Sequence, residues 1–342
     1  MQKGINTCSS VGNYVQIIGV VLLYWTISIS LVFANKYLVG NTANNLQDIS
    51  LLVAWLQCVL TVLLIFGSRF VRALITQDWR VLAFPLHLLR SRPLLLMTLS
   101  FVAMLSFNNL CLHNVHVSFY QVARSLTLIF TVVLSVLVLR RPVSLRVMAC
   151  CTLVVNGFIL GVDQESLMGT LSSSGLLYGI SSSLFVALNG IFTKQALEVT
   201  QGDAVQLTLL SNINAVLLFV PVLLATNQFR HFAENDNISY NFCLFLIGTG
   251  VLGFFIAWIS ALQIHLTSPV SHHISSNTKA VLQTILAVVY FGESRSPLWW
   301  LSVGMVVMGA TAYALVRLWE ERQDAKKHLS GSLSKIQSDP SC

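Results

Sequence analysis

Charged residues are scarce in this sequence. Asp, Glu, Lys and Arg make up 10% of the 342 residues, whereas hydrophobic residues make up 55% and the mean hydropathy is +0.74. Soluble chains carry about 25% charged residues, which cover the surface of their domains. So few charges exclude a water-soluble protein of this size, and the composition also excludes disordered and collagen-like chains. It predicts an integral membrane protein.

Acidic residues are missing from the apolar segments, because all 13 Asp and Glu lie outside them. Proton relays and cation-coupled symporters use carboxylates inside the membrane, and cation channels use acidic rings, so neither class finds its residues here. The seven cysteines form no C-x-x-C pair, and the chain has no P-loop, nucleophile motif or paired catalytic carboxylates. The sequence therefore predicts no enzyme, no ATP-driven pump, no cofactor and no metal site.

The hydrophobic residues gather in ten long runs. A membrane-spanning helix needs about 17–25 mostly apolar residues, because the hydrocarbon core is about 30 Å thick. We expect transmembrane helices at approximately residues 13–35, 50–68, 93–111, 118–139, 145–161, 173–193, 206–226, 240–263, 271–291 and 297–319. The alternating strands of a β-barrel, about 10 residues each, do not fit such continuous runs. The predicted fold class is an all-α membrane protein with ten transmembrane helices.

The basic residues indicate the orientation. Most of the 20 Lys and Arg lie in the two tails and in the loops after the second, fourth and sixth runs. Cytosolic loops are enriched in these residues, so both tails are predicted to be cytosolic. The net positive charge thus reflects topology, and no nucleic-acid partner is predicted. We expect residues 1–12 to form a cytosolic N-tail and residues 320–342 a disordered cytosolic C-tail.

Two segments, 109–141 and 261–293, share one layout. Each begins at the end of a helix with Leu and His, passes through a short loop into a polar helix start, and continues with a cation and a long apolar stretch. Five runs separate the two copies, and because five is odd, the halves must insert in opposite senses. This pattern predicts a 5+5 inverted-topology repeat, residues 13–161 and 173–319, with the substrate near the midplane between the halves.

Two cations lie inside the predicted helices. Arg124 stands about two turns into the fourth run, and Lys279 stands about two turns into the ninth. An unpaired cation at the bilayer centre costs about 2.5–3.5 kcal/mol. Snorkelling toward the headgroups would avoid that cost, and so would a water-filled cavity that takes an anion. Because both cations lie deep and no acid neutralises them, we favour a paired cationic site for a phosphorylated solute.

Other polar side chains in the predicted helices can complete such a site. Amides can pair with the edge of a nucleobase, and hydroxyls can pair with ribose or sugar. Each of them alone is more often a hydrogen bond between helices than a ligand contact. Besides the two cations, the candidates are Tyr24, Asn108, Tyr120, Ser211, Asn212, Ser276 and Asn277. The Gly157-x-x-x-Gly161 spacing allows close helix contact, either within the chain or in a homodimer.

Several of these segments carry a family resemblance. They include Tyr24-Trp25-Thr26-Ile27-Ser28, Phe107-Asn108-Asn109, Tyr120 through Arg124-Ser125-Leu126-Thr127, and Lys279-Ala280 with Gln283-Thr284. With them the sequence, from about residue 13 to 319, resembles the nucleotide-sugar transporters of the drug/metabolite transporter superfamily, and most closely the Golgi GDP-fucose transporters.

The resemblance implies an antiporter that imports GDP-fucose from the cytosol into the Golgi lumen and returns GMP by alternating access. The endoplasmic reticulum stays open as an alternative membrane. For this function we assign Arg124 and Lys279 to the phosphates, and Ser211 and Asn212 to guanine. The ribose or sugar would contact Tyr24, Tyr120, Ser276 and Asn277.

Two motifs depart from the family pattern. Related GDP-sugar carriers have Phe-Tyr-Asn-Asn in the seventh span, where this chain has Leu209-Leu210-Ser211-Asn212. The ninth-span motif resembling Ser-Gly-Thr-Ala-Lys is Ser275-Ser276-Asn277-Thr278-Lys279 here. Another GDP- or UDP-sugar, such as GDP-mannose, or a phosphorylated sugar therefore stays open as the cargo. A membrane scaffold that transports nothing is the alternative from a different class.

Overall fold

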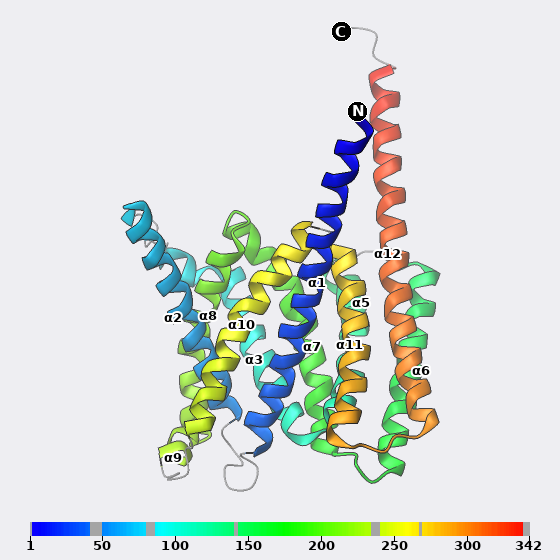
Figure 1. Cartoon of the computed structure of the whole chain (residues 1–342). Coiled ribbons are helices and arrows are strands. Elements are labelled where there is room, and N and C mark those ends of the chain that lie inside the picture. The colour runs from blue at the N-terminus through cyan, green and yellow to red at the C-terminus, as the bar shows by residue number, and fades with distance from the viewer. Residues whose placement is uncertain are drawn as a thin grey trace.

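A computed structural model describes residues 2–41, 50–79, 86–139, 143–233, 240–266 and 269–337 (Figure 1). Every regular element in these ranges is a helix. The helices are α1 (Gln2–Asn41), α2 (Ser50–Thr76), the 3-10 helix η3 (Leu86–Arg90), α3 (Arg92–Asn114), α4 (Val117–Arg124), α5 (Leu126–Leu139), α6 (Leu145–Leu167), α7 (Ser173–Val199), α8 (Ala204–Ala225), α9 (Gln228–Ala233), α10 (Tyr240–Leu266), α11 (Pro269–Phe291) and α12 (Pro297–Gln337). The all-α class is confirmed.

Nine segments in the described ranges are long and apolar enough to cross a membrane. They lie in α1, α2, α3, α6, α7, α8, α10 and α12, and the ninth, Val117–Leu137, combines α4 and α5. Large apolar side chains such as Leu137 and Val289 are exposed on the outside of the bundle, as a lipid-facing surface requires. The chain is a multi-pass membrane protein. The remaining predicted span, 271–291, lies in α11, whose first half is polar, so the tenth crossing stays a prediction.

Local sequence explains where several helices begin and break. The side chains of Ser144, Ser172 and Asp203 accept hydrogen bonds from backbone N–H groups at the starts of α6, α7 and α8. The fourth predicted run is interrupted at Ser125, whose hydroxyl donates to the Val122 carbonyl oxygen at 2.6 Å. The backbone changes here too: the Ser125 N–H bonds to the Val122 carbonyl oxygen at 3.2 Å, and the Leu128 N–H bonds to the Ser125 carbonyl oxygen at 3.1 Å. These bonds span three residues instead of four, and this tighter turn separates α4 from α5. The break lies directly after Arg124.

The helices of the bundle pack against one another in pairs. α3 packs along α7, α10 along α1, α2 along α8, and α6 along α12. A Cβ added to Gly157 would lie 2.9 Å from the Ser302 carbonyl oxygen of α12, and one added to Gly161 would lie 3.2 Å from the Ser302 hydroxyl. These glycines therefore let α6 approach α12 closely. The glycine pair serves a contact within the chain.

Both ends of the chain project from the same end of the bundle, where α1 begins and α12 ends (Figure 1). The structure continues the helices into the predicted tails, since α1 begins at Gln2 and α12 runs to Gln337. A disordered C-tail was expected from residue 320, whereas residues 320–337 are helical in the structure. Residues 338–342 lie outside the described ranges.

Candidate functional site

A cavity of about 1820 Å³ opens between the helices. Residues of α1, α4, α5, α11 and α12 line most of it. Its lining reaches Ser144 at the start of α6 and Gln323 on the outer part of α12, so the cavity opens at the end of the bundle from which both chain ends project. We call this opening the mouth.

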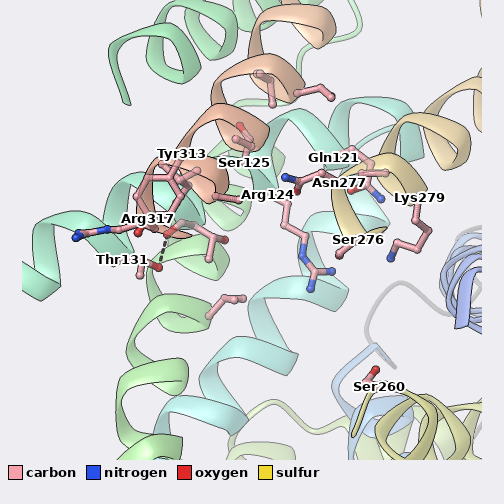
Figure 2. Close-up of a pocket in the computed structure, with 18 of the residues that line it drawn as sticks. Gln121, Arg124, Ser125, Thr131, Ser260, Ser276, Asn277, Lys279, Tyr313 and Arg317 are labelled. Atoms are coloured by element: carbon pink, nitrogen blue, oxygen red, sulfur yellow. Dashed lines mark hydrogen bonds between the residues drawn. The ribbon is translucent and has the colours of Figure 1, made fainter. Parts of the chain in front are cut away.

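Arg124 reaches into this cavity from the last residue of α4 (Figure 2). Its side chain is exposed, although the residue lies well inside a span, because the cavity brings solvent to it. Arg124 Nη1 donates a hydrogen bond to the Tyr120 hydroxyl at 3.2 Å, and that hydroxyl donates to Asn108 Oδ1 at 3.1 Å. Ser182 also donates to Asn108 Oδ1, at 2.5 Å. Tyr120, which is itself fixed by Asn108, thus helps to set the position of the Arg124 guanidinium.

Lys279 enters the same cavity from α11 (Figure 2). Its ammonium donates to the Ser28 hydroxyl of α1 at 2.7 Å and lies 5.6 Å from the centre of the Tyr24 ring. The Tyr24 hydroxyl in turn donates to Ser276 Oγ at 3.3 Å. Contacts between α1 and α11 therefore fix the lysine, and only 9% of its surface is exposed.

Neither cation has an acidic partner among the described residues. The ion pairs found there involve Arg295 and Arg317, together with the contact between His116 and Glu293. The partners of Arg124 and Lys279 are neutral hydroxyls. Two positive charges therefore face one water-reachable space away from bulk solvent, where attraction for an anion exceeds that at an exposed surface.

Comparisons with known proteins identify the family. Residues 15–314 match the sequence profile of the triose-phosphate transporter family. The chain belongs to the triose-phosphate transporter family. It is 42% identical over 312 residues to GDP-fucose transporter 1 of Nematostella vectensis, covering 89% of each chain. It is 40% identical over 330 residues to GDP-fucose transporter 1 of Mus musculus, covering 95% of this chain and 86% of the relative. It is 35% identical over 312 residues to the Golgi GDP-fucose transporter of Drosophila melanogaster, covering 91% and 92%.

This transporter gathers most of the predicted site residues in one region. Tyr24, Arg124, Ser276, Asn277 and Lys279 line the cavity. Tyr120 and Asn108 are not part of the lining. Tyr120 acts on it by accepting a hydrogen bond from Arg124, and Asn108 acts on it by accepting one from Tyr120.

Ser211 and Asn212 lie apart from this group of residues. Both are buried in α8, and both donate to the Thr208 carbonyl oxygen of their own helix, at 3.0 and 2.8 Å. They do not line the cavity. Their assignment to guanine stays a prediction that needs a different arrangement of α8.

Sequence reasoning missed part of the cavity lining. Gln121 stands one turn before Arg124 on α4 and lines the cavity opposite Asn277, as Figure 2 shows. The helical spacing from Arg124 could have identified it, because residues three apart share a face. At the mouth, Tyr313 and Arg317 of α12 also contribute, and Arg317 pairs with Glu320 at 3.3 Å.

Proposed function

We propose that this transporter exchanges GDP-fucose for GMP across the Golgi membrane by alternating access. The observation that carries the proposal is the pair of cations, Arg124 and Lys279, in one open cavity without an acidic partner among the described residues. The names of its relatives support the cargo and the Golgi location, since they are GDP-fucose transporters.

The charges of the two solutes match this site. A sugar-linked diphosphate carries two negative charges, and a phosphate monoester carries about −1.5 to −2 near neutral pH. Arg124 offers a planar fork for two phosphate oxygens, and Lys279 adds a point charge. One pair of cations can therefore serve both GDP-fucose and GMP, and the exchange leaves the membrane potential nearly unchanged.

The groups around the cations suit the rest of the ligand. Tyr24, Ser276 and Asn277 present hydroxyls and an amide to the same cavity, and Gln121 adds a second amide. Such groups donate to and accept from the hydroxyls of ribose or fucose. Tyr120 and Asn108 would orient Arg124, and Ser211 and Asn212 are retained as the predicted guanine contacts.

Helix packing supports the inverted repeat. If the first five spans correspond to the last five, α1 matches α7 and α3 matches α10, so the α3–α7 contact should have a counterpart between α10 and α1. Both contacts are present, and the pairs α2–α8 and α6–α12 are their own counterparts. This arrangement supports α11 as the tenth crossing and both chain ends on the cytosolic side, with the mouth open to the cytosol.

The test is uptake of labelled GDP-fucose by purified protein in liposomes loaded with GMP. We expect uptake that depends on internal GMP and exceeds uptake of GDP-mannose and UDP-sugars. Arg124→Ala and Lys279→Ala should each abolish it. Arg72→Ala is the matched control, because Arg72 of α2 is exposed and does not line the cavity. No uptake of any nucleotide sugar by the wild type would reject the proposal.

A second candidate cargo is another nucleotide sugar. The Leu209-Leu210 pair, in place of the aromatic residues of related carriers, favours this alternative. A panel of competing nucleotides in the same assay decides between them: stronger inhibition by a UDP-sugar or GDP-mannose than by GDP-fucose would select the alternative.

A further inference from the structure

A buried cluster of charges lies at the end of the bundle opposite the mouth. Arg295, in the turn between α11 and α12, contacts Glu165 at the end of α6 and donates to Glu293 Oε2 at 2.7 Å. It also donates to Ser118 Oγ at the start of α4, at 2.8 Å. Only 3% of the Arg295 side chain is exposed, and the two carboxylates are 2% and 6% exposed. We call these four residues the distal cluster.

The distal cluster joins the two predicted repeats. Ser118 belongs to the first repeat, and Glu165 lies on the last turn of α6, just beyond that repeat's predicted end at residue 161, whereas Glu293 and Arg295 belong to the second repeat. Ser118 lies on α4, the short helix that carries Arg124. His116, just before α4, adds a further link, with Nδ1 at 3.1 Å from Glu293 Oε1. Any rearrangement that opens this end between the repeats must separate these groups.

An apolar layer lies between the cavity and the distal cluster. Val117, Tyr120, Ala287 and Trp299 pack together there and are buried. The Trp299 indole N–H donates to Glu165 Oε1 at 3.1 Å, which fastens this layer to the cluster. The cavity is therefore closed at its distal end first by apolar contacts and then by charges.

One polar side chain, Gln283, is buried in the closed region between the cavity and the distal cluster. Gln283 lies one turn beyond Lys279 on α11, in the direction of the distal cluster, and is completely buried. Neither its amide oxygen nor its amide nitrogen has a hydrogen-bond partner in the described parts of the chain. A buried amide without partners costs free energy in this state, so its presence needs an explanation. A state in which water or solute reaches Gln283 supplies one.

We propose that the distal cluster is the latch that closes the far end of the transport pathway while the mouth is open, and that its release exposes Gln283. This proposal rests on the proposed function, because it assigns the closed gate of the same exchange cycle. A buried charge network suits a latch, since its charges satisfy one another only in the closed geometry and removal of one partner leaves others buried and unpaired. By the predicted orientation, the latch faces the lumen.

The test is the rate at which a thiol reagent labels Gln283→Cys in the purified protein. Position 283 is closed to solvent even though the mouth is open, so labelling reports opening of the distal end. Arg295→Gln should raise this rate about tenfold or more, and Arg295→Lys should raise it less, because local opening becomes more populated as the latch weakens. Glu320→Gln, which removes the Arg317–Glu320 pair at the mouth, is the matched control and should leave the rate unchanged.

Native Cys58 separates release of the latch from general unfolding. Its side chain is buried in α2, within a different core cluster, so it should stay unlabelled when only the distal end opens. Faster labelling of the thiol introduced at position 283, with Cys58 still protected, supports the latch. An unchanged labelling rate at position 283, or equal acceleration at both thiols, overturns it. If the wild type exchanges nucleotides normally in either case, the proposed function survives; if it exchanges none, both proposals fall.

Discussion

The cavity and the distal end of this bundle give arginine opposite surroundings. Well inside its span, Arg124 faces the cavity, and its side chain bonds only to the Tyr120 hydroxyl among the described residues. At the distal end, Arg295 is enclosed by Glu165, Glu293 and Ser118. Among the described residues, Arg124 therefore has no carboxylate partner, whereas Arg295 has two.

This difference shows how function is divided along the pathway. A cation without a carboxylate is expensive inside a membrane protein unless an anion arrives, so Arg124 and Lys279 suit a site that fills and empties. A cation with its carboxylates in place requires no ligand and holds segments together. Adding a carboxylate to the cavity should therefore impair transport, and removing the cation from the distal cluster should lower stability.

The largest effect should follow when the cavity is made to resemble the distal cluster. Lys279→Glu would place a carboxylate in the cavity that Arg124 faces, so the arginine would gain an internal partner and the new carboxylate would repel the phosphates. We expect exchange to fall about 100-fold or more, since two charge-assisted contacts of about 1.5–3 kcal/mol each are lost. Initial rates in liposomes measure this.

The thermal unfolding temperature of Lys279→Glu provides the complementary readout, and it should not fall. A variant that keeps more than a tenth of the wild-type exchange rate would show that position 279 does not hold the phosphates.

At the distal end, loss of the arginine should lower the stability of the protein. Arg295→Gln leaves Glu165 and Glu293 buried without their cation, and breaking a buried pair in this way costs about 3–5 kcal/mol. Arg317→Gln is the matched change at the mouth, where the pair is partly exposed, and should cost about 1 kcal/mol or less. Denaturant unfolding in detergent compares the two variants. Equal losses would remove the distinction between the two ends.

A smaller change concerns the hydroxyl that holds the lysine. Ser28→Ala removes the 2.7 Å hydrogen bond to Lys279 without changing any charge. The ammonium should become less well positioned, and the KM for nucleotide sugar should rise about fivefold, which corresponds to about 1 kcal/mol. Tyr24→Phe, which removes only the hydrogen bond to Ser276, tests the neighbouring contact in the same assay. An unchanged KM for both variants would show that α1 does not set the position of Lys279.

The smallest expected effect is that of pH on Glu293. Burial acts to raise the pKa of this carboxyl, but hydrogen bonds from His116, Ser118 and Arg295 and the charge of Arg295 outweigh it and lower the pKa from 4.5 to about 2. A carboxyl with a lowered pKa stabilises the fold fully above its unfolded pKa and loses that contribution as the pH falls through the folded value.

The measurement is the stability difference between Glu293 and Glu293→Gln, both in a His116→Gln background. It should stay constant from about pH 7.5 to about pH 5.5 and shrink only below about pH 4.5, where the unfolded carboxyl takes up its proton. A difference that already shrinks above about pH 5.5 would mean that the carboxyl is not held ionised by its neighbours.

Sequence reasoning could locate the spans and the two cations, because both are properties of single segments. A long apolar run and a charge inside it are visible without knowledge of neighbouring helices. The break at Ser125 was not visible, since Leu126 continues the apolar run and the break is a local change in backbone hydrogen bonding between Ser125 and Val122.

The distal cluster could not be predicted for a related reason. Its members come from three separate places in the chain, and no spacing connects Ser118 and Glu165 with Arg295. Ser211 and Asn212 show the converse limit: a polar pair on a helix looks like a site, but the rotation of α8 decides whether it faces a cavity. In both cases, contacts between helices that lie far apart in the sequence determine where the side chains lie.

Equilibrium binding of GDP and of guanosine to the purified protein tests the central claim most directly, because the two ligands differ only in the diphosphate. If Arg124 and Lys279 bind the phosphates, GDP should bind about 100-fold more tightly than guanosine, the equivalent of about 2.7 kcal/mol. The difference should disappear in the Arg124→Gln/Lys279→Gln double variant. Equal affinities in the wild type, or a preference for GDP that survives in the double variant, would contradict it.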